Sequence, residues 1–154
     1  MLIKQFLNDK EHQELLNWAI ALDFYHKANG KDVFTYYLEK SYLPLLNNII
    51  TKVSEIYNQN YIKHKINYKE SCFVRINPKG WINVHTDTND KEVKNFNILL
   101  KKPQDGGFIL HGDTKVIMQE KDAYLLDATI PHGISSIKSD DYYYSILLYY
   151  GIIE

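Results

Sequence analysis

The feature of this sequence that most limits its fold is a run of short apolar segments from about Glu70 to the C-terminus. Turn sequences such as NPKG, TNDKE, PQDGG and GDT separate these segments. Glycine, proline, asparagine and aspartate favour reverse turns, and strands joined by short turns pair antiparallel. About eight strands of this kind predict an antiparallel sandwich or barrel.

The N-terminal part of the chain has a helical pattern instead. Asn8 or Asp9 can cap a first helix, and a second helix is expected to begin near Ser41. The apolar positions of the first expected helix are Leu15, Trp18, Ala19 and Leu22. We therefore expect residues 1–66 to form a helical support region for a β core at residues 67–154, with the whole chain, 1–154, folded as a single domain.

Composition narrows the functional classes. The chain has 154 residues and a formal net charge of −1 at pH 7, which gives no electrostatic reason to expect binding to nucleic acid or to a membrane surface. The single cysteine, Cys72, excludes an internal disulfide and suits a reducing compartment. No segment is apolar over the length needed to span a bilayer. These features predict a cytoplasmic protein and leave its oligomeric state open.

One strand end carries residues that are suited to binding a metal. In the segment WINVHTD, strand alternation places His85 and Asp87 on the same side, and His132 follows in DATIPHG near another short strand. Two histidines and one carboxylate form the facial triad of non-haem Fe(II) oxygenases, which leaves open positions on the metal. A His-x-Asp pair alone is common, however, because a strand-end aspartate often accepts hydrogen bonds from turn amides. His111 lies at a hairpin turn, and we expect it to be outside the site.

The order and spacing of these motifs resemble the 2-oxoglutarate/Fe(II)-dependent oxygenases, particularly the prolyl hydroxylase-like and aspartyl/asparaginyl β-hydroxylase-like branches. The similarity runs from Ser71 to Gly151 and is carried by INPKGWINVHTD, FNILLKKPQDGGFIL and KDAYLLDATIPHGI. It implies a double-stranded β-helix, a jelly-roll or cupin-like barrel, so the expected fold class is mainly β with N-terminal helices (α+β). It also implies that His85, Asp87 and His132 are the metal ligands and catalytic residues.

The resemblance further implies Fe(II) and 2-oxoglutarate as cofactors, with one difference at the cosubstrate site. The last long strand of the family usually carries a basic residue, often two positions before a hydroxyl residue, that pairs with the far carboxylate of 2-oxoglutarate. The matching run YYYSILL places Tyr143 and Ser145 at these positions. The other expected cosubstrate contacts are Asn95, Asn97 and Arg75, although strand alternation favours an outward-facing Arg75.

The favoured function is therefore hydroxylation, with dioxygen, of a protein side chain or a small amino-acid-like substrate. The missing basic residue favours a first alternative, a cupin-like metalloprotein that uses another cosubstrate or none. The second alternative is a non-catalytic binding or scaffold protein that retains the fold. An enzyme binds metal and consumes cosubstrate, the alternative metalloprotein binds only metal, and a scaffold does neither.

Overall fold

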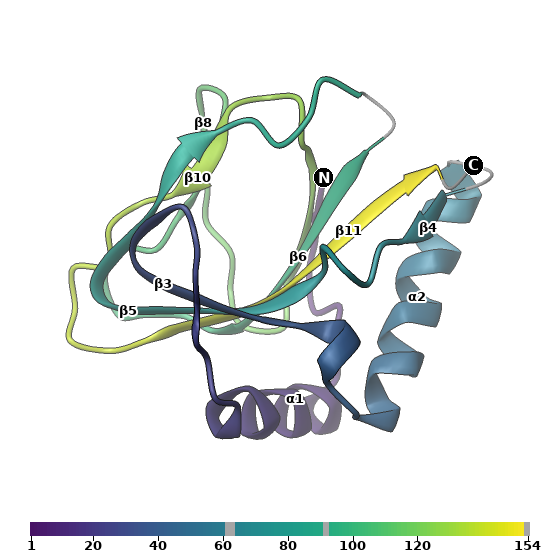
Figure 1. Cartoon of the computed structure of the whole chain (residues 1–154), viewed down its shortest axis with the longest axis horizontal. Helices are drawn as coiled ribbons and strands as arrows, with labels where there is room; N and C mark the ends of the chain where they lie inside the picture. The colour runs from purple at the N-terminus through teal and green to yellow at the C-terminus, as the bar shows by residue number, and fades with distance from the viewer. Residues whose placement is uncertain (61–63, 91–92, 153–154) are drawn as a thin grey trace.

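The computed structural model describes residues 1–60, 64–90 and 93–152, which form a curved sheet with two α-helices on its outer side (Figure 1). The helical elements are α1 (Asp9–Ala21), the 3-10 helix η1 (Leu38–Lys40) and α2 (Pro44–Asn60). The strands are β1 (Leu2–Ile3), β2 (His26–Lys27), β3 (Gly30–Tyr37), β4 (His64–Ile66), β5 (Cys72–His85), β6 (Lys94–Lys101), β7 (Ile109–His111), β8 (Thr114–Val116), β9 (Ala123–Asp127), β10 (His132–Ile134) and β11 (Tyr143–Ile152).

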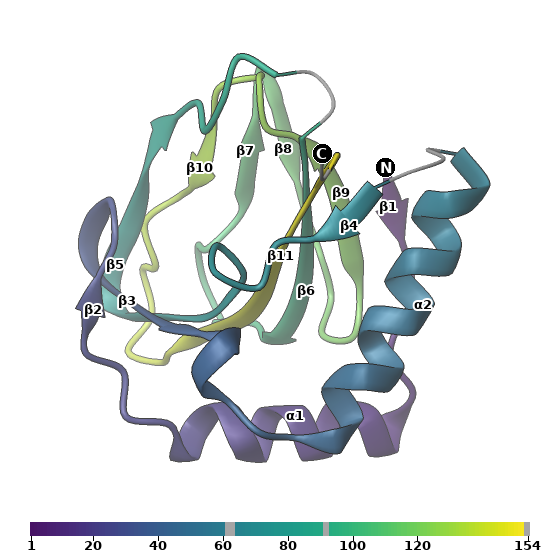
Figure 2. The same ribbon diagram turned by 45° about the vertical axis from the view of Figure 1, so that its right-hand side comes forward.

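All the strand pairs are antiparallel, and the main order of hydrogen-bonded neighbours is β1-β9-β6-β11-β5-β10-β7-β8. The long strand β5 connects two layers of this sheet, because its first half pairs with β11 and its last residues pair with β10. Figure 2 shows the two layers curling around a common interior. The mainly β jelly-roll architecture that the sequence predicts is therefore confirmed.

Two details differ from the expected element boundaries. The segments SCFVRI and WINVH, which the NPKG turn was expected to separate, form the single strand β5; Lys79 within it has a φ of 68°. A residue in this left-handed region bends a strand, so the turn sequence produces a curve rather than a chain reversal. The segment 1–66 is also not only helical, because β3 pairs with β5 from Gly30–Ile82 to Tyr37–Cys72.

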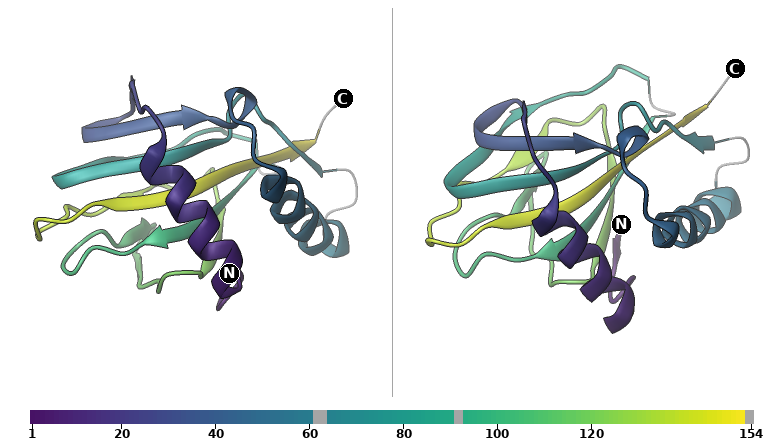
Figure 3. Two further views of the ribbon diagram at one scale, coloured as in Figure 1. Left: turned by 90° about the horizontal axis from the view of Figure 1, so that it is seen from below. Right: turned by 60° about the horizontal axis from the view of Figure 1, so that its bottom comes forward.

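One of the two layers contains β6, β11 and the first half of β5, and packing on its two sides positions the helices and leaves the interior for a site. The outer side is covered by α1 and α2, whose buried residues Leu15, Ile49 and Val53 pack in one cluster with Phe96 of β6. Figure 3, which includes a view from below, shows α1 crossing the strands of this layer. A separate buried cluster fills the space between the two layers. None of the helices in the described part of the chain is long and apolar enough to cross a membrane.

The ends of the helices follow from local sequence. Asn8, rather than Asp9, caps α1, since its side chain accepts a hydrogen bond from the Glu11 backbone amide at 2.8 Å and the Glu11 carboxylate accepts one from the Asn8 amide at 3.0 Å. This reciprocal pair is a capping box. The helix α2 begins at Pro44, three residues after the expected start at Ser41, because proline fits the first helical turn.

Truncation of Phe96 tests the packing of the helices on the outer side. Its ring is fully buried, with centroids 5.2 Å from Phe6 and 6.0 Å from Tyr57. Phe96→Ala is expected to lower the free energy of unfolding by about 3–5 kcal/mol, measured by urea denaturation. Ile20→Ala on α1 is the control, since Ile20 is 56% exposed and its truncation should change stability by less than about 0.5 kcal/mol. Equal small losses in both variants would contradict this packing.

Candidate metal centre

The end of β5, the segment after it and the start of β10 bring His85, Asp87 and His132 together. The antiparallel pairing of β10 with β5 places His132 directly opposite His85, and the two ring centroids are 4.7 Å apart. One ligand atom from each of the three residues lies within 4.8 Å of the others. The cluster predicted from the sequence is therefore assembled, in a geometry that can hold one metal ion.

The carboxylate of Asp87 lies between the two imidazoles. Its Oδ1 is 3.0 Å from His85 Nε2, and its Oδ2 is 3.0 Å from His132 Nε2. The Nδ1 of each ring contacts a backbone carbonyl, that of Asn83 at 2.6 Å and that of Ile130 at 2.8 Å. Because a carbonyl only accepts hydrogen bonds, it keeps the proton of a neutral ring on Nδ1 and leaves Nε2 as the metal-binding nitrogen.

Two further side chains hold one oxygen of Asp87. The Asn95 amide donates to Oδ2 at 3.1 Å, and the Tyr149 hydroxyl donates to the same oxygen at 3.0 Å. The Asp87 side chain is only 16% exposed, so these donors replace contacts with water. They fix the rotation of the carboxylate, while Oδ1 faces His85 Nε2. Residues that orient a metal ligand in this way strengthen metal sites.

Asp87 and His132 shift each other's pKa in opposite directions. Burial alone would raise the pKa of Asp87, but hydrogen bonds from His132 and Tyr149 hold it below its ordinary value. Burial alone would lower the pKa of His132, but the hydrogen bond and negative charge of Asp87 raise it above its ordinary value. Burial, followed by the charge of Asp87, raises the pKa of Tyr149, which therefore remains a neutral donor. Each group of the pair thus stabilises the charged form of the other.

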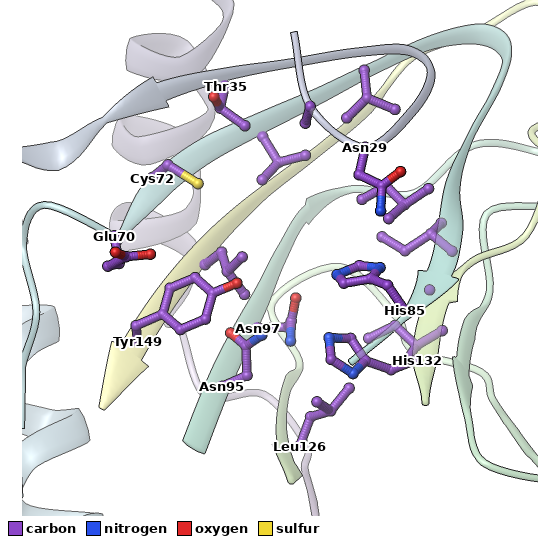
Figure 4. A pocket seen from close by; sticks show the side chains of 18 of the residues that line it. Asn29, Thr35, Glu70, Cys72, His85, Asn95, Asn97, Leu126, His132 and Tyr149 are labelled. Atoms are coloured by element: carbon purple, nitrogen blue, oxygen red, sulfur yellow. The ribbon is translucent and has the colours of Figure 1, made fainter. Parts of the chain in front are cut away.

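A cavity of about 230 Å³ opens beside the two imidazoles, between the layers of the sheet (Figure 4). The apolar part of its wall includes Val33, Val74, Ile109, Ile134 and Leu147. Its wall also includes neutral polar groups, namely Asn29, Thr35, Tyr37, Asn95, Asn97 and Tyr149. Of the described residues that line it, none is a lysine or an arginine, and the carboxylate in its wall is that of Glu70.

The residues expected at the cosubstrate site divide into two groups. Asn95 and Asn97 line the cavity. Tyr143 and Ser145 contact each other in the buried interior and are not on the cavity wall, and burial raises the pKa of Tyr143 to about 12. Arg75 points to the outer side of the sheet, where its guanidinium lies 5.2 Å and 5.0 Å from the ring centroids of Phe24 and Phe34.

Sequence reasoning did not identify the contributions of Tyr149, Glu70 and Thr35. The position of Tyr149 could have been inferred, because it shares a face of β11 with Tyr143 and Ser145. Glu70 and Thr35 come from a turn and from an unexpected strand, so only the tertiary fold brings them to the cavity. His111 lies opposite His132 on β7 and contacts the Tyr124 hydroxyl through Nδ1 at 2.9 Å, but it is not part of the three-residue cluster.

Solved structures with this fold include several oxygenases. The viral collagen prolyl hydroxylase of Paramecium bursaria Chlorella virus-1 aligns with a TM-score of 0.83 and 17% identity, covering 100% of this chain and 96% of that one. A prolyl-4-hydroxylase from Pseudomonas putida has a TM-score of 0.81 and 13% identity, covering 100% and 92%. HygX from Streptomyces hygroscopicus has a TM-score of 0.80 and 11% identity, covering 99% and 82%. At these identities the similarity shows the fold alone.

Sequence comparison supplies the family. The search of curated proteins finds no match. The model of the aspartyl/asparaginyl beta-hydroxylase family matches residues 10–146, a span that includes His85, Asp87 and His132. Since this match covers most of the chain and agrees with the fold, the chain belongs to the aspartyl/asparaginyl β-hydroxylase family.

Proposed function

We propose that this protein is an Fe(II)- and 2-oxoglutarate-dependent hydroxylase. The observation that carries the proposal is the cluster of His85, Asp87 and His132 beside a cavity inside a jelly-roll, in a chain of a hydroxylase family. Its two nitrogens and one carboxylate are the donor set of non-haem Fe(II) oxygenases. Two structural neighbours support the cofactors, since the viral hydroxylase was solved as a complex with 2-oxoglutarate and HygX with nickel and 2-oxoglutarate.

The residues of the centre have separate roles in this proposal. His85 Nε2, His132 Nε2 and a carboxylate oxygen of Asp87 would hold the metal, and Asn95 and Tyr149 orient that carboxylate. A bound Fe(II) would supply the position at which dioxygen and a 2-oxo acid react. The interior cavity keeps that position between the layers and limits its contact with bulk water. The substrate, a protein side chain or a small molecule, would reach the centre through the open side of the cavity.

The far carboxylate of 2-oxoglutarate would meet only neutral donors. The amide of Asn97 lines the cavity two residues beyond Asn95 on β6, and it has no hydrogen bond with a described residue. The amide nitrogen of Asn95 is already used by Asp87. An amide can donate to the far carboxylate, a contact of about 1.5–3 kcal/mol, but it cannot neutralise the charge or grip both oxygens as an arginine would. We therefore infer that 2-oxoglutarate binds weakly and depends on Asn97.

Anaerobic titration with Fe(II) and 2-oxoglutarate tests the proposed function. The wild-type protein is expected to bind one Fe(II) per chain and to develop a weak visible charge-transfer band when 2-oxoglutarate is added. Asp87→Ala should lose both, because it removes the ligand between the imidazoles. His111→Ala is the matched control and should retain both. Metal binding without the band would favour a metalloprotein with another cosubstrate, and no metal binding would favour a scaffold.

Protons should compete with the metal at neutral pH. A metal needs the neutral imidazole of His132, whose pKa in the metal-free protein is raised by Asp87. Affinity for Mn(II) should therefore fall steadily as the pH is lowered from about 8 to about 5.5, and the fall should begin above the ordinary histidine value of about 6.5. Calorimetry at several pH values measures it. An affinity that does not change over this range would contradict histidine ligation.

Replacement of Asn97 tests the cosubstrate contact. Asn97→Asp keeps the shape of the side chain but adds a negative charge to the cavity wall, so it should weaken 2-oxoglutarate binding to the Mn(II)-loaded protein by roughly tenfold or more. The affinity for Mn(II) itself should stay within about threefold. Asn48→Asp, an exposed position on α2, makes the same charge change elsewhere and should have no effect. Equal 2-oxoglutarate affinities in all three proteins would place the cosubstrate away from Asn97.

A further inference from the structure

The cavity beside the imidazoles continues into an open groove on the outside of the barrel. Two residues, Glu70 and Tyr149, line both spaces. The groove also includes Asp87 and Thr88, so it leads directly to the candidate metal centre. In Figure 4 Glu70 lies on one side of the cavity and the imidazoles lie on the other, with Tyr149 and Asn97 between them. Glu70 therefore lies where the groove and the cavity meet.

The position of Glu70 is fixed by its turn. The Asn67 carbonyl accepts hydrogen bonds from the Glu70 amide at 3.2 Å and from the Ser71 amide at 2.9 Å. The turn is attached to β11 at Tyr149, whose carbonyl accepts from the Asn67 amide at 2.9 Å and whose amide donates to the Ser71 hydroxyl at 3.0 Å. Tyr149, whose hydroxyl donates to Asp87, is thus also hydrogen-bonded to the turn that contains Glu70.

The carboxylate of Glu70 forms no ion pair with a described residue, although Lys65 and Lys69 line the outer groove that it shares. It also makes no side-chain hydrogen bond with a described residue, and no described lysine or arginine lines the cavity. A carboxylate without an ion-pair partner at the mouth of a cavity that no described lysine or arginine lines favours a ligand that brings a positive charge.

The other groups near Glu70 also suit such a ligand. Thr35 is only 8% exposed, lines the cavity and makes no side-chain hydrogen bond with a described residue, so its hydroxyl is available to accept one. The wall between these polar groups includes the apolar side chains of Val33, Val74 and Leu147. The combination fits a cationic donor at the end of an aliphatic chain. A centre that held Fe(II) and a dianionic 2-oxo acid would also have a net negative charge, because the charges of Asp87 and the 2-oxo acid outweigh the two positive charges of Fe(II). That net charge would favour a cationic substrate.

We propose that the substrate carries an alkylammonium group that binds Glu70, either as a free aliphatic amine or as a lysine side chain. The carbon chain of the substrate then lies along the apolar wall toward the metal position. This inference rests on the proposed function for the role of the site, but the recognition of the cation depends only on Glu70 and the cavity. Glu70 is accordingly a specificity-determining residue.

Ligand-observed NMR with the metal-free protein at neutral pH tests this inference without iron or 2-oxoglutarate. The probes are n-pentylamine, n-pentanol and pentanoate, which have the same chain length and different charges. Pentylamine is expected to bind the wild-type protein roughly fivefold more tightly than pentanol, a modest ratio because Glu70 is at the exposed mouth. Pentanoate is expected to bind more weakly than pentanol. Addition of Mn(II) should broaden the pentylamine signals, which places the amine near the metal centre.

Two variants make the result specific. Glu70→Gln should bind pentylamine and pentanol equally, while Glu39→Gln, which removes a carboxylate that lines only the groove, should keep the wild-type preference. Lysine blocked as its N-acetyl methylamide separates the two sources, since binding as tight as that of pentylamine indicates a lysine side chain and much weaker binding indicates a free amine. A pentylamine preference that survives in Glu70→Gln, or its absence in the wild type, would overturn the inference. Loss of the Fe(II) and 2-oxoglutarate response alone would instead refute the proposed function.

Discussion

The close antiparallel approach of β10 to β5 is the contact on which the candidate site depends. His132 faces His85 and Ile134 faces Ile82, so the register shifts between these pairs and β5 carries an extra residue there. Gly133 allows the approach, because a Cβ at this position would lie 2.8 Å from the Ile82 carbonyl oxygen. A larger residue would separate the strands and the two imidazoles with them.

The same contact determines the electrostatics of the centre. With the imidazoles fixed, Asp87 becomes a shared partner, and its Oδ2 also receives the Asn95 amide and the Tyr149 hydroxyl. Four side chains thus converge on one carboxylate, and these contacts offset the cost of burying its charge. A divalent cation would be held by the two Nε2 atoms and a carboxylate oxygen of Asp87. The neutral and acidic groups of the cavity then decide which organic ligands can accompany the metal.

The side of a strand that each residue faces is the feature of this structure that the sequence predicts most directly. Alternation was sufficient to put His85 and Asp87 on one side and to turn Arg75 toward the helices, where it stacks on Phe24 and Phe34. Alternation does not predict which of the inward-facing residues line the cavity and which lie in the packed interior. Tyr143 and Ser145 do face inward, but they lie in the packed interior rather than on the cavity wall.

Contacts between segments that are distant in the chain could not be predicted from the sequence. The strand β3 lies in a region that was expected to be helical, and it supplies Val33, Thr35 and Tyr37 to the cavity through its pairing with β5. Glu70 reaches the cavity because its turn is hydrogen-bonded to Tyr149. Both depend on which elements pack together, and local residue patterns do not specify that choice.

The most direct test of a metal centre at Asp87 is anomalous diffraction from crystals grown with Mn(II). One anomalous peak per chain is predicted, within about 2.0–2.3 Å of His85 Nε2, His132 Nε2 and one carboxylate oxygen of Asp87. The second carboxylate oxygen should remain hydrogen-bonded to Asn95 and Tyr149. A peak elsewhere in the chain, or an empty cluster at a saturating Mn(II) concentration, would contradict the central claim.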